Sequence, residues 1–376
     1  MREIYSSLAC NLDANILLAS IPLFEQENIE AIEWSFDALY KYDQIPPWFA
    51  DLVSEYARNN RLVGHGIYFS IFSGKWLPEQ QQWLNKLAVF CKEFRFDHIS
   101  EHFGFMTGAD FHKGAPISIP FTSKIVELGA DRLARIQEIC QCPVGLENLA
   151  FAYSFNEVKK QGEFLDCLIE KVNGFLILDL HNLYCQLHNF SISARELLKA
   201  YPLERVREIH ISGGSWEQGL ASDRKIRRDT HDDAVPEEVF ALLNDTIPLC
   251  PNLKFVVLEQ LGTGLTTDES RAQFQTDFNR MDSIVRLHRT NNADSLDNDF
   301  IPKVPLHINT TPVEDVLLYQ QQQELSHILE TASDLNHAQQ LLLASSLNRS
   351  AWHIDQWTPE MLHTAISIAQ KWKNGF

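Results

Sequence analysis

The chain has 376 residues, of which 45% are hydrophobic and 22% are charged, so it can bury the core of a large folded protein. Its formal net charge of −18 disfavours nucleic acid and anionic membrane surfaces as partners, because both repel an acidic protein. No apolar run approaches the length of a membrane span, so we expect no transmembrane segment.

Short apolar runs alternate with amphipathic segments over about residues 1–290. The runs predict eight β-strands, at residues 5–12, 30–36, 61–69, 97–103, 143–148, 175–182, 207–213 and 255–260. Apolar residues at helical spacing predict helices between and after them, including 46–60, 79–94, 122–140 and 268–288. Eight alternating units indicate a closed α/β barrel of the (β/α)8 TIM type. An open doubly wound sheet is disfavoured, because no glycine-rich phosphate loop follows an early strand.

The character of the chain changes after the barrel, residues 1–290. Residues 291–312 are polar and interrupted by proline, which predicts a linker. Residues 313–376 carry apolar residues at helical spacing and predict a small C-terminal helical extension. Thr358 and Pro359 are expected to cap and to begin one of its helices.

The seven cysteines stand mostly in apolar contexts, and the first residues lack the pattern of a secretion signal. We therefore expect reduced thiols in a protein located in the cytoplasm. The closely spaced pair in the stretch CQCP has no second such pair to complete a zinc site.

Side chains that can bind metals stand where the predicted strands end, and in a TIM barrel these ends meet at one rim. Carboxylates buried together need cations to neutralise them. Imidazole nitrogens and carboxylate oxygens without thiolates suit Fe(II), Mn(II), Co(II) or Zn(II), and the size of the set predicts two or three ions. The rim residues are His65, Glu101, His102, Glu147, Asn148, Asp179, His181, Asn182, His210, Asp229, His231, Asp232 and Glu259.

Some of these residues also have structural interpretations. Alternation along residues 97–103 places Glu101 on one face of the strand and both His98 and His102 on the other. The strand-end position favours His102 as a pocket ligand, whereas His98 is interpreted as a structural hydrogen-bond partner. Asn148 and Asn182 alternatively cap the helices that follow them.

The sequence resembles the multinuclear non-haem iron-dependent oxidative enzymes, which modify ribosomally made peptides and have xylose-isomerase-like barrels. The matching stretches extend over about residues 1–285 and are GHGIYFS, ISEHFGF, LENLA, LDLHNLY, EIHISG, DTHDDAVP and VLEQ. The resemblance implies that the metal-binding residues are His65, His102, Glu147, Asp179, Asn182, His210, Asp229, His231 and Glu259. We add His181 to this set, and His102, Asp229 and His231 are the predicted catalytic residues.

Two positions depart from the pattern of that family. His181 stands where the family often has an asparagine, and Gly214 stands where it often has a histidine. The chain thus gains one imidazole and lacks another. We expect this exchange to change either a metal site or the residues that surround it.

The resemblance also implies an activity. It predicts an enzyme that uses two or three iron ions, Fe(II)/Fe(III), with O2 as co-substrate, to oxidise a residue of a precursor peptide, most often cysteine. A small companion protein that binds the leader peptide is the implied partner. The stretches EHFGF and DLHNLYCQ are closest to the branch that makes 3-thiaglutamate-type products.

Alternative functions remain open at this point. A redox-silent divalent-metal barrel, such as a sugar isomerase or a phosphodiesterase acting on abasic DNA, would use similar ligands, although the net charge disfavours the latter. A scaffold or metal-storage protein would use the extension to bind its partner. For residues 313–376, packing on the outer helices of the barrel is favoured over docking of the leader peptide or companion protein.

Overall fold

The computed structural model describes residues 3–40, 45–108, 114–220, 223–289 and 298–373. Within these ranges, eight parallel strands close into a barrel in the order β1-β12-β9-β8-β7-β4-β3-β2, which confirms the predicted TIM barrel. The strands are β1 (Tyr5–Ala9), β2 (Ala31–Trp34), β3 (Leu62–Gly66), β4 (Ile99–His102), β7 (Val144–Glu147), β8 (Phe175–Asp179), β9 (Val206–Ile211) and β12 (Phe255–Leu258). Each overlaps one predicted range but ends earlier, because the residues after it form the loops of the rim or, after β8, a helix.

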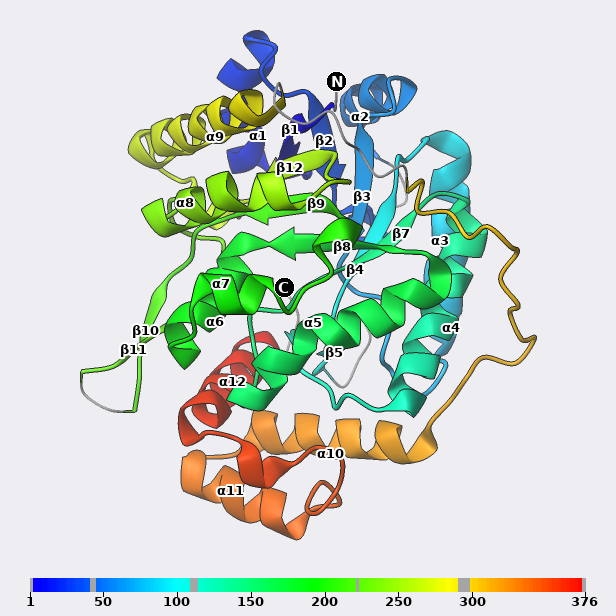
Figure 1. Ribbon diagram of the computed structural model, residues 1–376, viewed down its shortest axis with the longest axis vertical. Helices are drawn as coiled ribbons and strands as arrows, with labels where there is room; N and C mark the ends of the chain where they lie inside the picture. The colour runs from blue at the N-terminus through cyan, green and yellow to red at the C-terminus, as the bar shows by residue number, and fades with distance from the viewer. Residues whose placement is uncertain (1–2, 41–44, 109–113, 221–222, 290–297, 374–376) are drawn as a thin grey trace.

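Helices surround this barrel, as Figure 1 shows. Helix α4 illustrates how they form: the hydroxyl of Thr122 caps its first turn, Leu128 and Leu133 are buried, and Gln141 ends it with a φ of 55°. The helices up to residue 289 are α1 (Ala14–Glu25), α2 (Pro47–Arg58), α3 (Pro78–Glu93), α4 (Ser123–Cys140), α5 (Phe155–Ile169), α6 (Leu180–Phe190), α7 (Ala194–Leu198), α8 (Glu237–Thr246) and α9 (Asp268–Arg289).

Short hairpins extend two of the rim loops. Strand β5 (Phe105–Met106) pairs with β6 (Pro116–Ile117) after β4, and β10 (Trp216–Gln218) pairs with β11 (Lys225–Arg227) after β9. The hairpin β10–β11 projects from the side of the molecule near α12 (Figure 1). These hairpins lie at the rim that carries the predicted metal ligands.

The extension consists of α10 (Val316–Thr331), α11 (Leu335–Ala344) and α12 (Pro359–Trp372), coloured orange to red in Figure 1. Thr358 caps α12 and Pro359 begins it, as predicted. Residues 298–315, which precede α10, form no helix or strand, and the part of the predicted linker at 291–297 lies outside the described residues.

The extension packs on loops of the barrel rim. Gln322 of α10 donates to the carbonyl of Phe72 at 2.7 Å, and the ring of Trp357 stacks on Tyr153 with centroids 3.7 Å apart. Its buried apolar residues belong to the same hydrophobic cluster as those of the barrel. The sequence had favoured packing on the outer helices, and residues at the start of the extension do contact α4, where Arg132 donates to the carbonyl of Val313 at 2.8 Å and Lys124 pairs with Asp315 at 2.9 Å. The rim loops provide further contacts.

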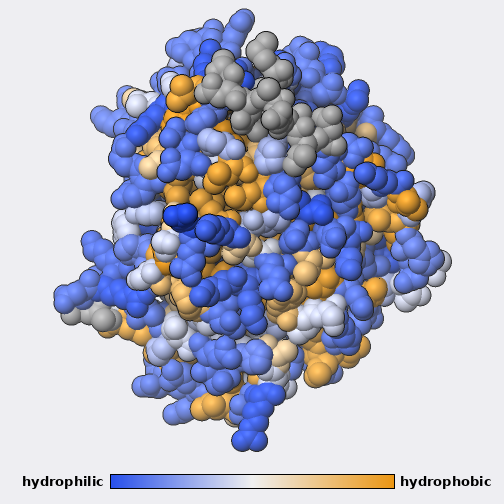
Figure 2. Space-filling model, in the orientation of Figure 1, coloured by the Kyte–Doolittle hydropathy of each residue, from blue (hydrophilic) through white to orange (hydrophobic). Residues whose placement is uncertain are grey.

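The face shown in Figure 2 is mostly hydrophilic, with scattered apolar patches. Large exposed apolar side chains such as Leu18, Trp48 and Leu343 are distributed over α1, α2 and α11. Among the described residues, no helix is both long enough and apolar enough to cross a membrane.

The inside of the barrel is unusually polar. Branched apolar side chains fill most TIM barrels. Here Glu33, His65, His98, Glu208 and His210 are all at most 3% exposed and approach one another from β2, β3, β9 and the residue before β4. Burying so many ionisable groups is costly unless they are paired or bind cations, so this interior marks the candidate site.

Candidate metal centre

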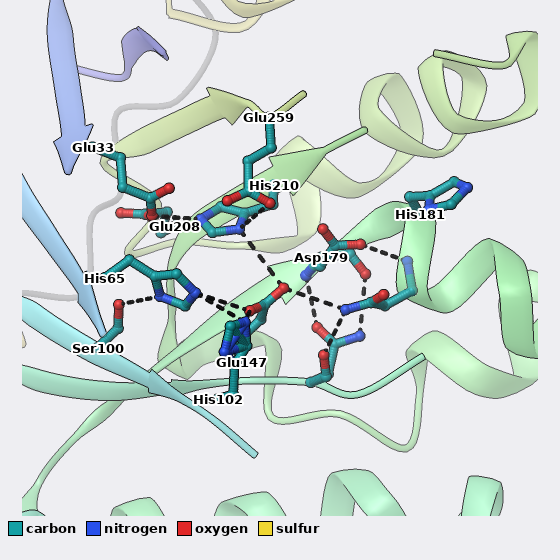
Figure 3. A network of polar contacts seen from close by, with 12 residues as sticks. Glu33, His65, Ser100, His102, Glu147, Asp179, His181, Glu208, His210 and Glu259 are labelled. Carbon is teal, nitrogen blue, oxygen red and sulfur yellow. Dashed lines mark hydrogen bonds and ion pairs between the residues drawn. The ribbon is translucent and has the colours of Figure 1, made fainter. Parts of the chain in front are cut away.

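Three neighbouring strands place metal-binding atoms in a triangle (Figure 3). His65 stands on β3, His102 ends β4 and Glu147 ends β7. The His65 Nε2–His102 Nε2, His65 Nε2–Glu147 Oε2 and His102 Nε2–Glu147 Oε2 distances are all 3.2 Å. An ion that binds such atoms at about 2.0–2.2 Å separates neighbouring ligands by about 3.0–3.5 Å. The spacing therefore fits the ligands of one ion.

A neighbouring serine fixes the orientation of the His65 ring. Ser100 Oγ donates to the carbonyl of Gly64 at 3.2 Å, so it accepts the Nδ1 proton of His65 at 2.9 Å. The other nitrogen, Nε2, then presents its lone pair to the triangle. Burial lowers the pKa of His65, but the carboxylates of Glu33 and Glu147 outweigh it and raise the pKa to about 10. A positive charge next to this imidazole, from a proton or from a bound metal ion, is therefore strongly favoured.

A second group of ligand atoms adjoins the first and shares Glu147 with it. Atoms of Glu147, Asp179, His210 and Glu259 all lie within 4.8 Å of one another. His210 Nδ1 is 3.2 Å from Glu259 Oε2 and 3.8 Å from Glu147 Oε1. Glu147 thus directs one carboxylate oxygen to each group, which is the arrangement of a carboxylate that bridges two ions.

Two buried oxygens near this second group lack hydrogen-bond partners. They are Asp179 Oδ2 and Asn182 Oδ1. An unpaired buried carboxylate oxygen is energetically costly, and burial raises the pKa of Asp179 well above its usual value. Both oxygens fit a role as metal ligands.

Two glutamates hold the opposite nitrogen of His210. Its Nε2 is 2.7 Å from Glu208 Oε1 and 3.0 Å from Glu33 Oε2, so Nε2 carries the proton and Nδ1 faces Glu147 and Glu259. This carboxylate–histidine pairing is common behind metal-binding histidines. Burial raises the pKa of Glu33 to about 8, although the neighbouring His210 lowers it.

Glu33 and Glu208 were absent from the residues selected by sequence. The missed signal is alternation, because Glu208, His210 and Ser212 occupy every second position of the stretch EIHIS and point the same way. Glu33 lies within the stretch AIEW and gives a weaker signal, since a single glutamate in a strand normally faces solvent.

The buried polar side chains inside the barrel continue from Glu208 towards the end that lies opposite the metal-binding rim. His98 Nε2 lies 2.7 Å from Glu208 Oε2, and Asp97 lies 3.6 Å from His98 Nδ1. His98 therefore shares the inner face with His102, as strand alternation predicted. Glu101 lies on the outer face, close to Trp83 and behind Gly66, away from the triangle.

Asp229 and His231 meet in the loop after β11. His231 Nε2 is 3.0 Å from Asp229 Oδ1, and His231 Nδ1 is 3.6 Å from Glu259 Oε2. His231 adopts a φ of 51°, a left-handed conformation that turns the loop back towards the rim. The pair thus lies beside the second group through Glu259.

His181 uses both ring nitrogens in contacts with other side chains. Its Nδ1 lies 2.9 Å from Asp229 Oδ1, and its Nε2 accepts a hydrogen bond from Arg227 Nε at 3.1 Å. Arg227 can only donate, so Nδ1 carries the proton that His181 donates to Asp229. We therefore propose that His181 positions Asp229 and does not bind a metal itself.

Gly214 leaves room for this imidazole. A Cβ atom at Gly214 would lie 2.9 Å from His181 Cε1 and 2.3 Å from the carbonyl oxygen of Arg228. A side chain at 214 would therefore compete with the His181 ring for the same space. The two departures from the family pattern are thus coupled in space.

We expect His181→Ala to weaken metal binding about 10–100-fold without emptying the centre, as loss of an orienting partner does. His231→Ala is expected to lose one ion completely. His188→Ala on the same helix is the matched control, because the contacts of His188 are with the backbone of Lys225 and the ring of Trp216 and not with the predicted ligands. Metal titrations of the three variants measure the difference, and equal losses in His181→Ala and His231→Ala would identify His181 as a ligand.

Asn148 and Asn182 have distinct roles next to β8. Asn148 pairs with the backbone of Asp179 in both directions, at 2.6 and 3.1 Å, so it links β7 to β8. The predicted strand 175–182 is wrong at its end, because Asp179 caps α6, which starts at Leu180. Asn182 consequently lies in a first helical turn, where its Nδ2 donates to Glu147 Oε1 at 3.3 Å.

A cavity of about 270 Å³ opens above these groups. Its floor includes His65, His102, Asp229, His231 and Glu259. Its walls are largely apolar and include Ala115, Pro116, Leu149, Phe151, Met361 and Ile368. The cavity can therefore take a ligand that has one polar reacting group and an apolar surrounding part.

The chain is similar to several bacterial proteins. A UPF0276 protein of Shewanella oneidensis is 30% identical over 180 residues, which cover 48% of this chain and 62% of that protein. A UPF0276 protein of Caulobacter vibrioides is 27% identical over 179 residues, which cover 47% of this chain and 61% of that protein. The chain thus spans less than two thirds of the length of these relatives.

Among solved structures, a xylose isomerase domain protein from Planctomyces limnophilus matches 77% of this chain and 99% of its own, with 12% identity and a TM-score of 0.50. That likeness supports the barrel fold alone. A family model for the RiPP precursor modification enzyme MbnB/TglH/ChrH matches residues 41–262, more than half of the chain. The site residues from His65 to Glu259 lie inside that match, and the chain belongs to this family of RiPP precursor modification enzymes, as its motifs suggested.

Proposed function

We propose that this protein is an O2-dependent iron enzyme that oxidises a cysteine of a ribosomally made precursor peptide. The observation that carries the proposal is the triangle of His65, His102 and Glu147, with edges of 3.2 Å. Two histidines and one carboxylate around an ion with open positions are typical of non-haem Fe(II) enzymes that react with O2. Membership of a RiPP-modifying family supports a peptide as the substrate.

In the proposed centre, Glu147 would supply a ligand atom to each of two iron ions. His65 and His102 complete the ligands of the first, and the second uses Glu147, Asp179, His210 and Glu259. Asp229 and His231 are proposed for a third position, with Asn182 Oδ1 as a further ligand. When bound, iron supplies the redox chemistry with O2 that amino-acid side chains lack.

Side chains of the protein are proposed to bind the substrate and to hold or transfer protons. Burial lowers the pKa of His102 to about 4, so its imidazole is neutral near pH 7 and free to act as a ligand. Burial also lowers the pKa of His231, but the Asp229 and Glu259 carboxylates outweigh it and raise the pKa well above its usual value. His102, Asp229 and His231 line the cavity and are the proposed catalytic residues.

The apolar walls of the cavity favour oxidation of a peptide over the sugar isomerase and phosphodiesterase alternatives. They exclude water from a side chain held over the floor, which protects a reactive oxidation. A sugar isomerase would need polar groups around most of its substrate, and a phosphodiesterase for abasic DNA would need a basic surface. A companion protein that binds the leader peptide, a cytoplasmic location and a 3-thiaglutamate-type product remain proposals from the sequence motifs.

Metal analysis of protein purified without oxygen tests this function. We expect more than one iron per chain, magnetic coupling between ferric ions in Mössbauer spectra, and O2 uptake that depends on a cysteine-containing precursor peptide. Mössbauer spectra report on the centre independently of turnover. A single bound zinc, with no iron and no O2 uptake, would favour the redox-silent alternative and contradict the proposal.

A further inference from the structure

We propose that α12 is the specificity-determining wall of the cavity, and that it selects an apolar residue beside the modified residue of the peptide. This inference rests on the proposed function, since it takes a peptide as the substrate. It adds a role for the extension, which lies outside the family match to residues 41–262.

One face of α12 lines the cavity. The residues concerned are Met361, Thr364, Ile368, Lys371 and Trp372, whose spacing places them along one side of a helix. Met361 and Thr364 are buried, whereas Ile368 and Trp372 are partly exposed. The partly exposed pair is accessible to a ligand in the cavity.

Several contacts hold α12 in place over the rim. Glu360 accepts the backbone amide of Leu220 at 2.7 Å, and Ser367 donates to Glu217 at 3.1 Å, so the β10–β11 loop region holds one flank. Gln370 donates to the carbonyl of Ala332 at 2.8 Å and joins α12 to the end of α10. A wall fixed on two sides presents a defined surface, which selectivity requires.

The wall formed by α12 is mostly apolar, although Thr364 and Lys371 also belong to it, in contrast to the floor. Ile368 and Trp372 share the lining with Phe151, Leu149 and Pro116, whereas imidazoles and carboxylates form the floor. The cavity volume of about 270 Å³ is close to the lower end of small-ligand pockets, about 300–1,000 Å³. It therefore suits a short stretch of peptide whose reacting side chain points to the floor and whose neighbour packs on α12.

Paired variants that change the size of residue 368 test this role. The probe is a set of synthetic seven-residue peptides with a central cysteine and one randomised neighbouring position, bound without oxygen to iron-loaded protein and identified by mass spectrometry. Wild-type protein should enrich apolar over charged neighbours roughly tenfold. Ile368→Ala should shift the preference to larger neighbours, and Ile368→Trp should shift it to smaller ones.

The control is Leu343→Ala, since Leu343 is 63% exposed on α11 and does not line the cavity. It should keep the wild-type preference, and all variants should keep their iron and melting temperature. Opposite shifts in the two Ile368 variants support the inference, because a general loss of structure would weaken both in the same way. If wild-type protein selects peptides and neither variant changes the choice, α12 is not the wall. If iron-loaded wild-type protein retains none of these peptides but still takes up O2 with a full precursor peptide, the inference about α12 is contradicted while the proposed function stands.

Discussion

Glu147→Gln should lose iron from both proposed positions and reduce turnover by about 1,000-fold or more. The substitution keeps the shape of the side chain but removes the negative charge that both groups share. Its carboxylate stands 3.2 Å from two histidine nitrogens on one side and 3.8 Å from His210 Nδ1 on the other. A loss of about 4 kcal/mol in the stabilisation of the reacting state corresponds to that factor.

The matched control for this variant is Glu101→Gln. Glu101 is also a buried glutamate, 2% exposed, but it lies on the outer face of the neighbouring strand. We expect it to retain the iron content of the wild-type protein. Iron per chain and the melting temperature are the measurements. Full iron in Glu147→Gln, or equal loss in both variants, would contradict a bridging role for Glu147.

Removal of residues 313–376 should make the barrel aggregate or lose its iron. Buried side chains of the extension, including Leu325, Leu329 and Trp352, belong to the core cluster that they share with the barrel. Trp352 contacts Phe105 with ring centroids 5.8 Å apart. Burial of each such side chain contributes about 1.5–3 kcal/mol, and a domain is stable by only about 5–15 kcal/mol.

Solubility, melting temperature and iron content of the truncated protein measure this effect. Leu317→Ala, at a residue 59% exposed on α10, is the control and should leave all three unchanged. A soluble, iron-loaded barrel with the melting temperature of the full chain would contradict the expectation. The extension would then be an independent module, and a docking role for it would regain support.

The barrel could be predicted from the sequence because its signals are local. Apolar runs such as FLILD and the intervening helical spacing are readable along the chain. The end of β8 was not predictable in the same way, because the apolar residues of LHNLY continue the pattern while Asp179 caps a helix at that point. Capping and strand extension compete there, and contacts across the rim decide between them.

The rim residues were predictable as a set, since the ends of parallel strands must meet. Their individual roles depend on contacts between distant segments. The contacts of His181 with Arg227 and Asp229 join α6 to β11 and to the loop after it, and no local sequence pattern indicates these contacts. The position of α12 over the cavity likewise results from tertiary packing that helical spacing cannot specify.

The two sides of the cavity are encoded in separate parts of the chain. The floor residues lie between His65 and Glu259, inside the family match, whereas the α12 residues lie beyond residue 360. Mutations in α12 can therefore accumulate during evolution without disturbing the metal ligands. On the proposed roles, related enzymes could acquire new peptide substrates by exchanging this one helix, while the inherited chemistry of the barrel stays constant.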